Sequence, residues 1–363
     1  VSSKFVERAK IAATLLVAPI LAVAVLEGLS SLALVARAIR RTPRAEAAHI
    51  ERDTLLGWIN KANLSLPDLY ALGVGITTDV HRFRRVGPAG DTTIAGRAPL
   101  VCSGGSFTLG YGVNDAETWC ALLGTLDPAL APVNMGQGGY GLDQDYLWYL
   151  RDGMSLKPAV HIFAFVGWEF HRMQSDRFQG EPKPQLERSG DSVRAIGVPV
   201  PSPDMGPALL KLRNAAQSLR SVVLLQSLVG SRPTGVGSRG RDSSTWEVAR
   251  AALRDLARRD SLAGTKLIVV FLPMREDHTG TGNDLWRAWA QAAAASGDFT
   301  LVDLIEPFRR LPVDSIDPLF LTEDAMPFPA AAGHYTAAGN AWVARQLLPW
   351  VSPTPATGAM PRR

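Results

Sequence analysis

The chain has 363 residues, of which 46% are hydrophobic and 20% are charged. This is ample material for one large α/β domain with additions, and it excludes a chain too polar to bury a core. The formal net charge is +4, but basic residues cluster only at 37–44, 81–85 and 232–241. None of these clusters forms a motif typical of nucleic-acid binding, so we expect no nucleic-acid partner.

The first element along the chain is an almost uncharged apolar stretch over residues 11–36. About 20 apolar residues span a bilayer, so we predict one retained transmembrane helix within residues 1–45. The stretch is too long for a cleaved signal peptide, and no small-residue cleavage site follows it. Pro19 is tolerated in a membrane helix. Glu27 is expected at the headgroup level or, if it lies deeper, beside a partner from another helix.

A group of arginines follows the predicted membrane helix: Arg37, Arg40, Arg41 and Arg44. A basic cluster in this position contacts anionic lipid headgroups, so the bilayer is the first predicted partner. Basic residues also precede the helix, and the positive-inside rule therefore does not orient it.

Residues 46–95 are predicted to form a preface of short strands and turns, and residues 96–351 an α/β domain. Apolar runs in the second region predict strands at 100–102, 133–135, 159–166, 266–272 and 299–302. Apolar residues at three- and four-residue spacing predict helices at 118–126, 144–152, 244–259, 284–296 and 337–351. This alternation is typical of a parallel sheet covered on both faces.

One long segment interrupts the alternation. Residues 171–243 are rich in Pro, Gly, Ser and charge, with a helix-like apolar core at 208–228. An insertion of this length is usually a lid or a partner-binding segment. Residues 352–363 form a Pro-containing tail that we expect to be unstructured unless something binds it.

The chain has two cysteines, Cys102 and Cys120. They could form a disulfide in an oxidising compartment. Each of them also fits an apolar position in the core, and the sequence leaves both possibilities open.

The most informative motif is the turn Gly104-Gly105-Ser106, which follows an apolar run and precedes a helix. A serine in that position lies where backbone N–H groups stabilise an oxyanion. Thr108 stands where a Gly-x-Ser-x-Gly elbow needs its second glycine, so that elbow is excluded. Alone, Ser106 is also compatible with simple helix capping.

Three blocks in order, at 104–108, 134–141 and 334–339, resemble the SGNH or GDSL-like hydrolase family, specifically its membrane-anchored bacterial branch. The resemblance implies a three-layer α/β/α SGNH-hydrolase-like (flavodoxin-like) parallel sheet in a domain on the periplasmic side of the cytoplasmic membrane. It implies Ser106 as nucleophile and His334 as general base. The backbone N–H groups of the oxyanion region would come from Gly105 and Gly139.

The same comparison shows departures from the family pattern. The family commonly has Asp before the serine, where this chain has Gly105. Trp168 stands in place of an asparagine whose amide donates to the oxyanion, and its ring is expected to fill the pocket. Ala331 and Ala332 stand where the aspartate that orients the histidine is expected.

These losses have known magnitudes. In serine proteases, loss of the orienting carboxylate lowers turnover about 10⁴-fold, and loss of one oxyanion donor lowers it about 10² to 10³-fold. Glu323, Asp324 or Glu169 could replace the missing acid, and Asp324 is the favoured candidate because a loop could fold it back to His334.

Two functions of different classes follow. The first is a catalytically silent, structural or assembly subunit of a larger bacterial membrane complex, respiratory or photosynthetic, contacting protein partners through the membrane helix and residues 171–243. The alternative is an exported serine esterase or acyltransferase acting on acylated envelope glycans or lipids through Ser106 and His334. The lost residues favour the first.

A third, weaker possibility is sugar binding without turnover by tryptophans in the former pocket: Trp58, Trp119, Trp148 and Trp168. Burial in the core is the better explanation of these rings at their spacings. The sequence has no zinc-spaced His/Cys cluster, no phosphate-binding P-loop and no dinucleotide motif, so neither a metal nor a cofactor is expected.

Overall fold

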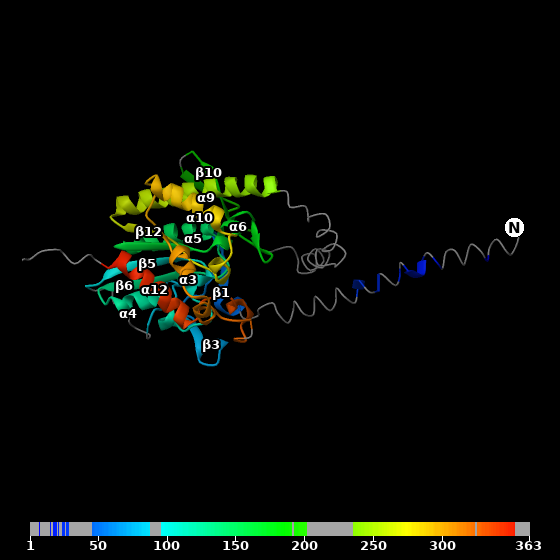
Figure 1. Ribbon diagram of the computed structural model, residues 1–363, viewed down its shortest axis with the longest axis horizontal. Helices are drawn as coiled ribbons and strands as arrows, with labels where there is room; N and C mark the ends of the chain where they lie inside the picture. Colours follow the sequence, from blue (N-terminus) through cyan, green and yellow to red (C-terminus); the bar gives the residue numbers. More distant parts are fainter. Residues whose placement is uncertain are drawn as a thin grey trace, which may run out of the picture. The chain divides into compact units, whose positions relative to one another are not determined.

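The computed structural model describes residues 46–87, 96–190, 192–201, 235–323 and 325–352, with single positions between 7 and 28 (Figure 1). Pro19 and Glu27 are among these positions, and both are helical. Most of the stretch 11–36 lies outside the described residues. The same holds for the helix expected at 208–228, for residues 353–363 of the tail, and for Arg37, Arg40, Arg41 and Arg44. Within the described part of the chain, no helix is both long and apolar enough to cross a membrane.

A five-stranded parallel sheet forms the centre of the domain, in the order β13-β12-β7-β5-β6. Its strands are β5 (Ala98–Gly104), β6 (Leu130–Gly136), β7 (Val160–Phe165), β12 (Lys266–Phe271) and β13 (Leu301–Asp303). The predicted parallel sheet is confirmed. Counted along the chain, the strand order is 2-1-3-4-5, which is the flavodoxin-like order of doubly wound sheets. In this arrangement ligands bind at the carboxyl ends of the strands, where the order reverses beside β5.

Helices cover both faces of the sheet (Figure 1). On one face lie α5 (Leu142–Trp148), α6 (Gly167–Met173), α9 (Gly235–Ala263) and α10 (Asp284–Ala295), and on the other α4 (Trp119–Leu126), α11 (Ile305–Arg309) and α12 (Ala337–Val351). Successive residues of a strand point to opposite faces. Val101 and Phe163 therefore pack in the first layer, and Leu100 and Ile162 in the second.

Short elements surround this core. The preface contains α2 (Glu46–His49), the hairpin of β1 (Ile50–Asp53) with β2 (Gly57–Asn60), and the hairpin of β3 (Ser65–Ala71) with β4 (Val74–Thr77). The described part of the insertion contains β8 (Arg177–Phe178), β9 (Glu181–Pro182), β10 (Gln185–Ser189) and β11 (Ser192–Ile196). Single turns are η1 (Asp115–Glu117), η2 (Tyr149–Gly153), η3 (Met154–Leu156), η4 (Arg275–His278), η5 (Val313–Ser315), η6 (Asp317–Leu319) and η7 (Pro329–Ala331).

The two cysteines form a disulfide that joins β5 to α4. Their Cα atoms are 6.2 Å apart, and both side chains are fully buried in the apolar layer beneath the sheet. Of the two possibilities that the sequence left open, the structure therefore has the bridge, and its β5 cysteine, Cys102, lies four residues before Ser106.

Candidate active site

Ser106 is the first residue of α3 (Ser106–Leu109), which begins where β5 ends. β5 is a buried strand of the sheet, and its parallel neighbours β6 and β7 end at the same edge, at Gly136 and Phe165. This edge is the one at which doubly wound sheets bind ligands. The serine is almost buried, with 5% of its surface exposed.

His334 meets Ser106 from the opposite end of the chain. Its Nε2 atom is 2.7 Å from the Ser106 Oγ atom. The imidazole lies between two aromatic rings, with ring centroids 4.5 Å from Phe107 and 5.2 Å from Tyr111. Backbone hydrogen bonds between Leu321 and the pair Gly333 and His334 hold the loop that presents it. The structure thus brings together the two residues that the sequence proposed as nucleophile and base.

The charge state of His334 suits a base. Burial, and to a smaller extent the positive charge of Arg172, lower its pKa to about 4, against the opposite effect of the carbonyl groups of Ala331 and Ala332. The imidazole is therefore neutral at pH 7. We assign its proton to Nδ1, which leaves the Nε2 lone pair facing the serine hydroxyl.

The acid that would orient His334 is not found among the residues described. Its Nδ1 atom is buried and has no hydrogen-bond partner there. Glu323 is exposed and makes no described contact with the imidazole, while Asp324 lies outside the described residues. The positions of Ala331 and Ala332 bring only main-chain carbonyls near the ring. The described site is therefore a serine–histidine dyad.

Glu169 occupies a different place from the one considered for a replacement acid. A Cβ atom built on Gly105 would lie only 2.6 Å from the Glu169 Oε1 atom, so this carboxyl fills the space that a side chain at position 105 would need. The side chain is buried and accepts a hydrogen bond from the Val166 backbone at 3.5 Å. Burial raises its pKa to about 8, against the charge of Arg172. A carboxyl group thus lies next to the nucleophile, supplied from β7's end of the sheet.

Trp168 does not cover the dyad. Its indole is 55% exposed, and Nε1 donates to the Glu276 Oε1 atom at 3.3 Å. This placement differs from the expectation that the ring fills the pocket, because the first turn of α6 points the side chain toward η4. Among the other tryptophans, Trp119 and Trp148 are buried in the core and Trp58 is 6% exposed.

The loop after β6 contains Gly139, whose φ of +79° favours glycine. A Cβ atom there would lie 2.7 Å from the Phe178 ring, so the insertion closes over this loop. The Trp58 Nε1 atom donates to the Gly138 carbonyl at 2.9 Å, which fixes the loop from the preface. Beside it lies a small cavity of about 50 Å³, lined in part by Trp58, Phe178 and Tyr111. Tyr111 also packs on His334, so one ring contacts both the cavity and the imidazole.

Sequence reasoning missed a second serine–histidine pair. Ser103 Oγ is 2.8 Å from His161 Nε2, and His161 Nδ1 is 2.8 Å from the Asp260 carboxylate. All three side chains are at most 1% exposed, and the Tyr149 ring stacks on the imidazole at 3.5 Å. The only sequence signal was a histidine within the apolar run 159–166. Because no substrate reaches it, we interpret this triad as a buried polar network.

No family model matches the chain, and no curated protein matches it. Solved structures do match. A protein from Desulfitobacterium hafniense DCB-2, described as lipolytic and of the G-D-S-L family, is 15% identical with a TM-score of 0.40, covering 70% of this chain and 99% of that one. The α/β hydrolase LAE5 from the Lake Arreo metagenome is 15% identical with a TM-score of 0.41, covering 71% and 96%.

A lipase/acylhydrolase from Enterococcus faecalis is 13% identical with a TM-score of 0.36, covering 71% of this chain and 100% of that one. The chain is similar to these proteins over 70 to 71% of its length. Identities and scores this low do not assign an activity.

Proposed function

We propose that this protein is a serine esterase or acyltransferase of SGNH type that acts through the dyad of Ser106 and His334. The observation behind the proposal is the 2.7 Å contact between the serine hydroxyl and the Nε2 atom of a neutral imidazole. This is the geometry that a general base needs to remove the hydroxyl proton. The placement of Trp168 supports the proposal, because its indole is turned toward Glu276 and does not fill the pocket as the sequence predicted.

The reaction follows from the two groups. The Ser106 Oγ atom attacks the carbonyl carbon of an ester while its proton moves to His334 Nε2. The tetrahedral intermediate then collapses, the C–O bond to the leaving alcohol breaks, and that alcohol takes the proton back. Water, or the hydroxyl of an acceptor, then attacks the acyl carbon while its proton moves to His334 Nε2; the bond between that carbon and the Ser106 Oγ atom breaks, and Oγ takes the proton back. The first acceptor gives hydrolysis and the second gives acyl transfer.

The absence of a described acid sets the expected rate. Without a carboxylate, the imidazolium that forms during each step is stabilised only by nearby carbonyl groups, such as those of Ala331 and Ala332. Loss of this carboxylate lowers turnover about 10⁴-fold in serine proteases. We therefore propose a slow enzyme. The same feature favours the second candidate, a catalytically silent domain in a membrane assembly, which retains the dyad without turnover.

Location is part of the proposal. The apolar stretch 11–36 supports a membrane anchor, and the disulfide between Cys102 and Cys120 supports a domain in an oxidising, extracytoplasmic compartment. An exported enzyme of this kind would meet acylated envelope glycans or lipids.

A fluorophosphonate probe, which reacts with activated serines, distinguishes the two candidates. We expect the full chain to be labelled, and labelling to disappear in Ser106→Ala and to fall at least tenfold in His334→Gln. Ser103→Ala is the matched control, because it removes the serine of the buried pair and leaves Ser106 in place. It should label at the wild-type rate. A folded wild-type chain that is not labelled would overturn the enzyme in favour of the silent domain.

A further inference from the structure

The helix that begins with the nucleophile has only four residues. A helix this short is not stable alone, because nucleation is unfavourable and its last carbonyl groups have no partner within the helix. Only the Ser106 carbonyl is used locally, by the backbone N–H groups of Gly110 and Tyr111. The position of Ser106 therefore depends on what binds the remaining carbonyl groups of α3.

Side chains from other elements bind them. The Trp119 indole donates to the Phe107 carbonyl at 3.2 Å, and the Asn134 amide donates to the Thr108 carbonyl at 2.9 Å. The last two carbonyl groups, those of Leu109 and Gly110, accept from one guanidinium.

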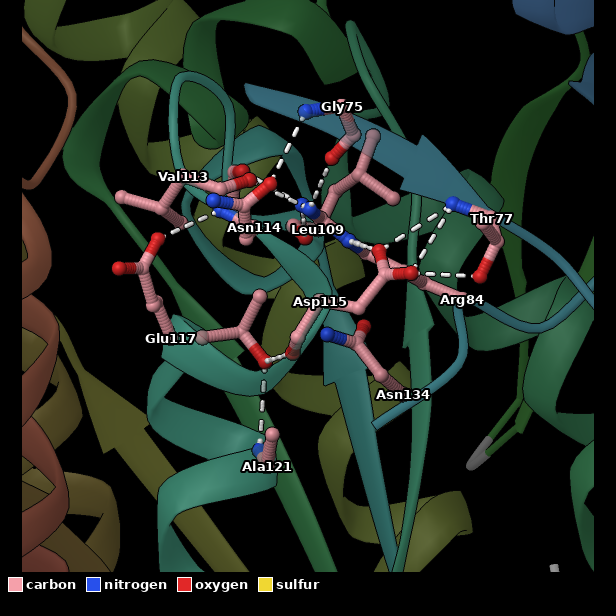
Figure 2. A network of polar contacts seen from close by, with 12 residues as sticks. Gly75, Thr77, Arg84, Leu109, Val113, Asn114, Asp115, Glu117, Ala121 and Asn134 are labelled. Atoms are coloured by element: carbon pink, nitrogen blue, oxygen red, sulfur yellow. Dashed lines mark hydrogen bonds and ion pairs between the residues drawn. The ribbon is translucent and has the colours of Figure 1, made fainter. Parts of the chain in front are cut away.

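That guanidinium belongs to Arg84, at the end of the preface. Its Nη1 atom donates to the carbonyl groups of Leu109 at 2.7 Å and Gly110 at 2.5 Å. Its Nη2 atom donates to the carbonyl group of Val113 at 2.6 Å and to that of Gly75, in β4, at 3.0 Å. Figure 2 shows these bonds meeting at the one side chain. Arg84 thus ties the end of α3, the loop after it and the preface together.

Arg84 is itself held in place. It is 1% exposed, and its Nε atom donates to Asp115 at 2.8 Å, so the buried charge is paired. Its backbone N–H donates to the carbonyl group of Asn134 at 3.0 Å. The Asp115 carboxylate also accepts from Thr77 in the preface (Figure 2). Because both its backbone and its guanidinium are held, Arg84 fixes the positions of the carbonyl groups that it binds.

Tyr111 lies in the loop between Gly110 and Val113, whose carbonyl groups both accept hydrogen bonds from Arg84. The Tyr111 ring packs on the His334 ring. Arg84 therefore fixes one neighbour of each member of the dyad: α3, which presents Ser106, and the loop that supports the imidazole. A general contribution to stability would not require its donors to converge on residues 109–113.

We propose that Arg84 is a positioning residue for Ser106 and His334, acting through the carbonyl groups of Leu109, Gly110 and Val113. This inference rests on the proposed function. A planar guanidinium with five donors satisfies this geometry, whereas an ammonium group does not.

The test uses Arg84→Lys and Arg84→Ala in the full chain, with Arg287→Lys as the matched control. Arg287 is also a buried arginine, paired with Asp303, and makes no described contact with α3. We expect Arg84→Lys to lower the fluorophosphonate labelling rate and kcat for p-nitrophenyl acetate at least tenfold with little change in KM. Arg287→Lys should stay within about twofold. Guanidinium at millimolar concentration should restore part of the rate to Arg84→Ala.

A second readout does not need catalysis. Amide hydrogen exchange over residues 106–113 should accelerate at least tenfold in Arg84→Lys and remain unchanged in Arg287→Lys. If the wild-type chain is not labelled, the proposed function fails, and hydrogen exchange still decides whether Arg84 holds α3. A folded Arg84→Lys protein with wild-type labelling and wild-type exchange would overturn the inference.

Discussion

At the scale of residues, burial rather than distance distinguishes the two serine–histidine pairs. The Ser106–His334 and Ser103–His161 contacts differ by only about 0.1 Å (2.7 and 2.8 Å), and the second pair even has a carboxylate, Asp260. That complete triad lies inside the core, where no substrate reaches. The incomplete dyad lies at the edge of the sheet where strands end. We therefore expect catalysis from Ser106 and His334, although this pair has no described carboxylate partner.

The pH dependence of the dyad is the first prediction at this scale. Because the pKa of His334 is lowered to about 4, the free base is present above that pH and lost below it. We expect the labelling rate to be half-maximal near pH 4 and flat from pH 5.5 to 7, instead of rising near the usual histidine value of about 6.5.

Arg172→Gln provides the control. Removing this positive charge should move the half-maximal pH upward, since the charge of Arg172 disfavours the protonated imidazole. A midpoint near pH 6.5 in the wild-type chain would contradict a buried, neutral base.

At the scale of elements, the local hydrophobic pattern correctly predicted the strands of the sheet. It did not predict which segments, distant in the sequence, contact one another. Each of the five predicted strands matches a strand of the sheet, because apolar runs in a doubly wound fold are buried on both faces. The helix expected at 244–259 lies inside α9, which begins earlier, at Gly235.

The sequence predicted only those site residues that belong to motifs at the ends of predicted strands and helices. Ser106 and His334 follow motifs at strand and helix ends, and the structure brings them together. The role of Arg84 depends on carbonyl groups 25 and 26 residues away, which no periodicity reveals. The position of Glu169 beside Gly105 likewise depends on strand order, since β5 and β7 are neighbours only in the folded sheet.

The disulfide gives the prediction at this scale. It joins β5 to α4 across a separation of 18 residues, and closing such a loop contributes about 3 kcal/mol to the free energy of unfolding. We expect Cys102→Ala/Cys120→Ala to unfold at correspondingly lower urea concentration. In cells that make the full chain, acid-quenched and denatured protein should react with a maleimide mass tag only after reduction. Tagging without reductant would contradict both the bridge and an exported domain, and Cys102→Ala, with one thiol, calibrates the shift.

At the scale of the whole molecule, buried carboxyl groups near the site link stability to pH. Asp145 and Glu169 are both buried, and burial raises the pKa of each. Their mutual repulsion raises that of Asp145 further. By contrast, the buried Asp143 carboxylate is paired with the Lys183 ammonium at 2.5 Å. Although the charge of Arg172 opposes it, burial dominates, and Asp145 and Glu169 take up protons on folding.

The raised pKa of Glu169 makes the free energy of unfolding fall as the pH rises. Glu169 has a folded pKa of about 8 against 4.5 for an ordinary glutamate, so the folded chain binds more protons than the unfolded chain between these values. The stabilising effect is complete below pH 4.5 and is lost as the pH rises through 8. His334 acts in the opposite direction, but only between about pH 4 and 6.5. We therefore expect Glu169 alone to lower the free energy of unfolding by roughly 2 kcal/mol between pH 6.5 and 8, at 1.36 kcal/mol per pH unit for one proton, and Asp145 to add to this fall. Urea titrations at both pH values should show a smaller fall in Glu169→Gln and none in Asp145→Asn/Glu169→Gln. An unchanged slope in the double variant would show that other groups take up the proton.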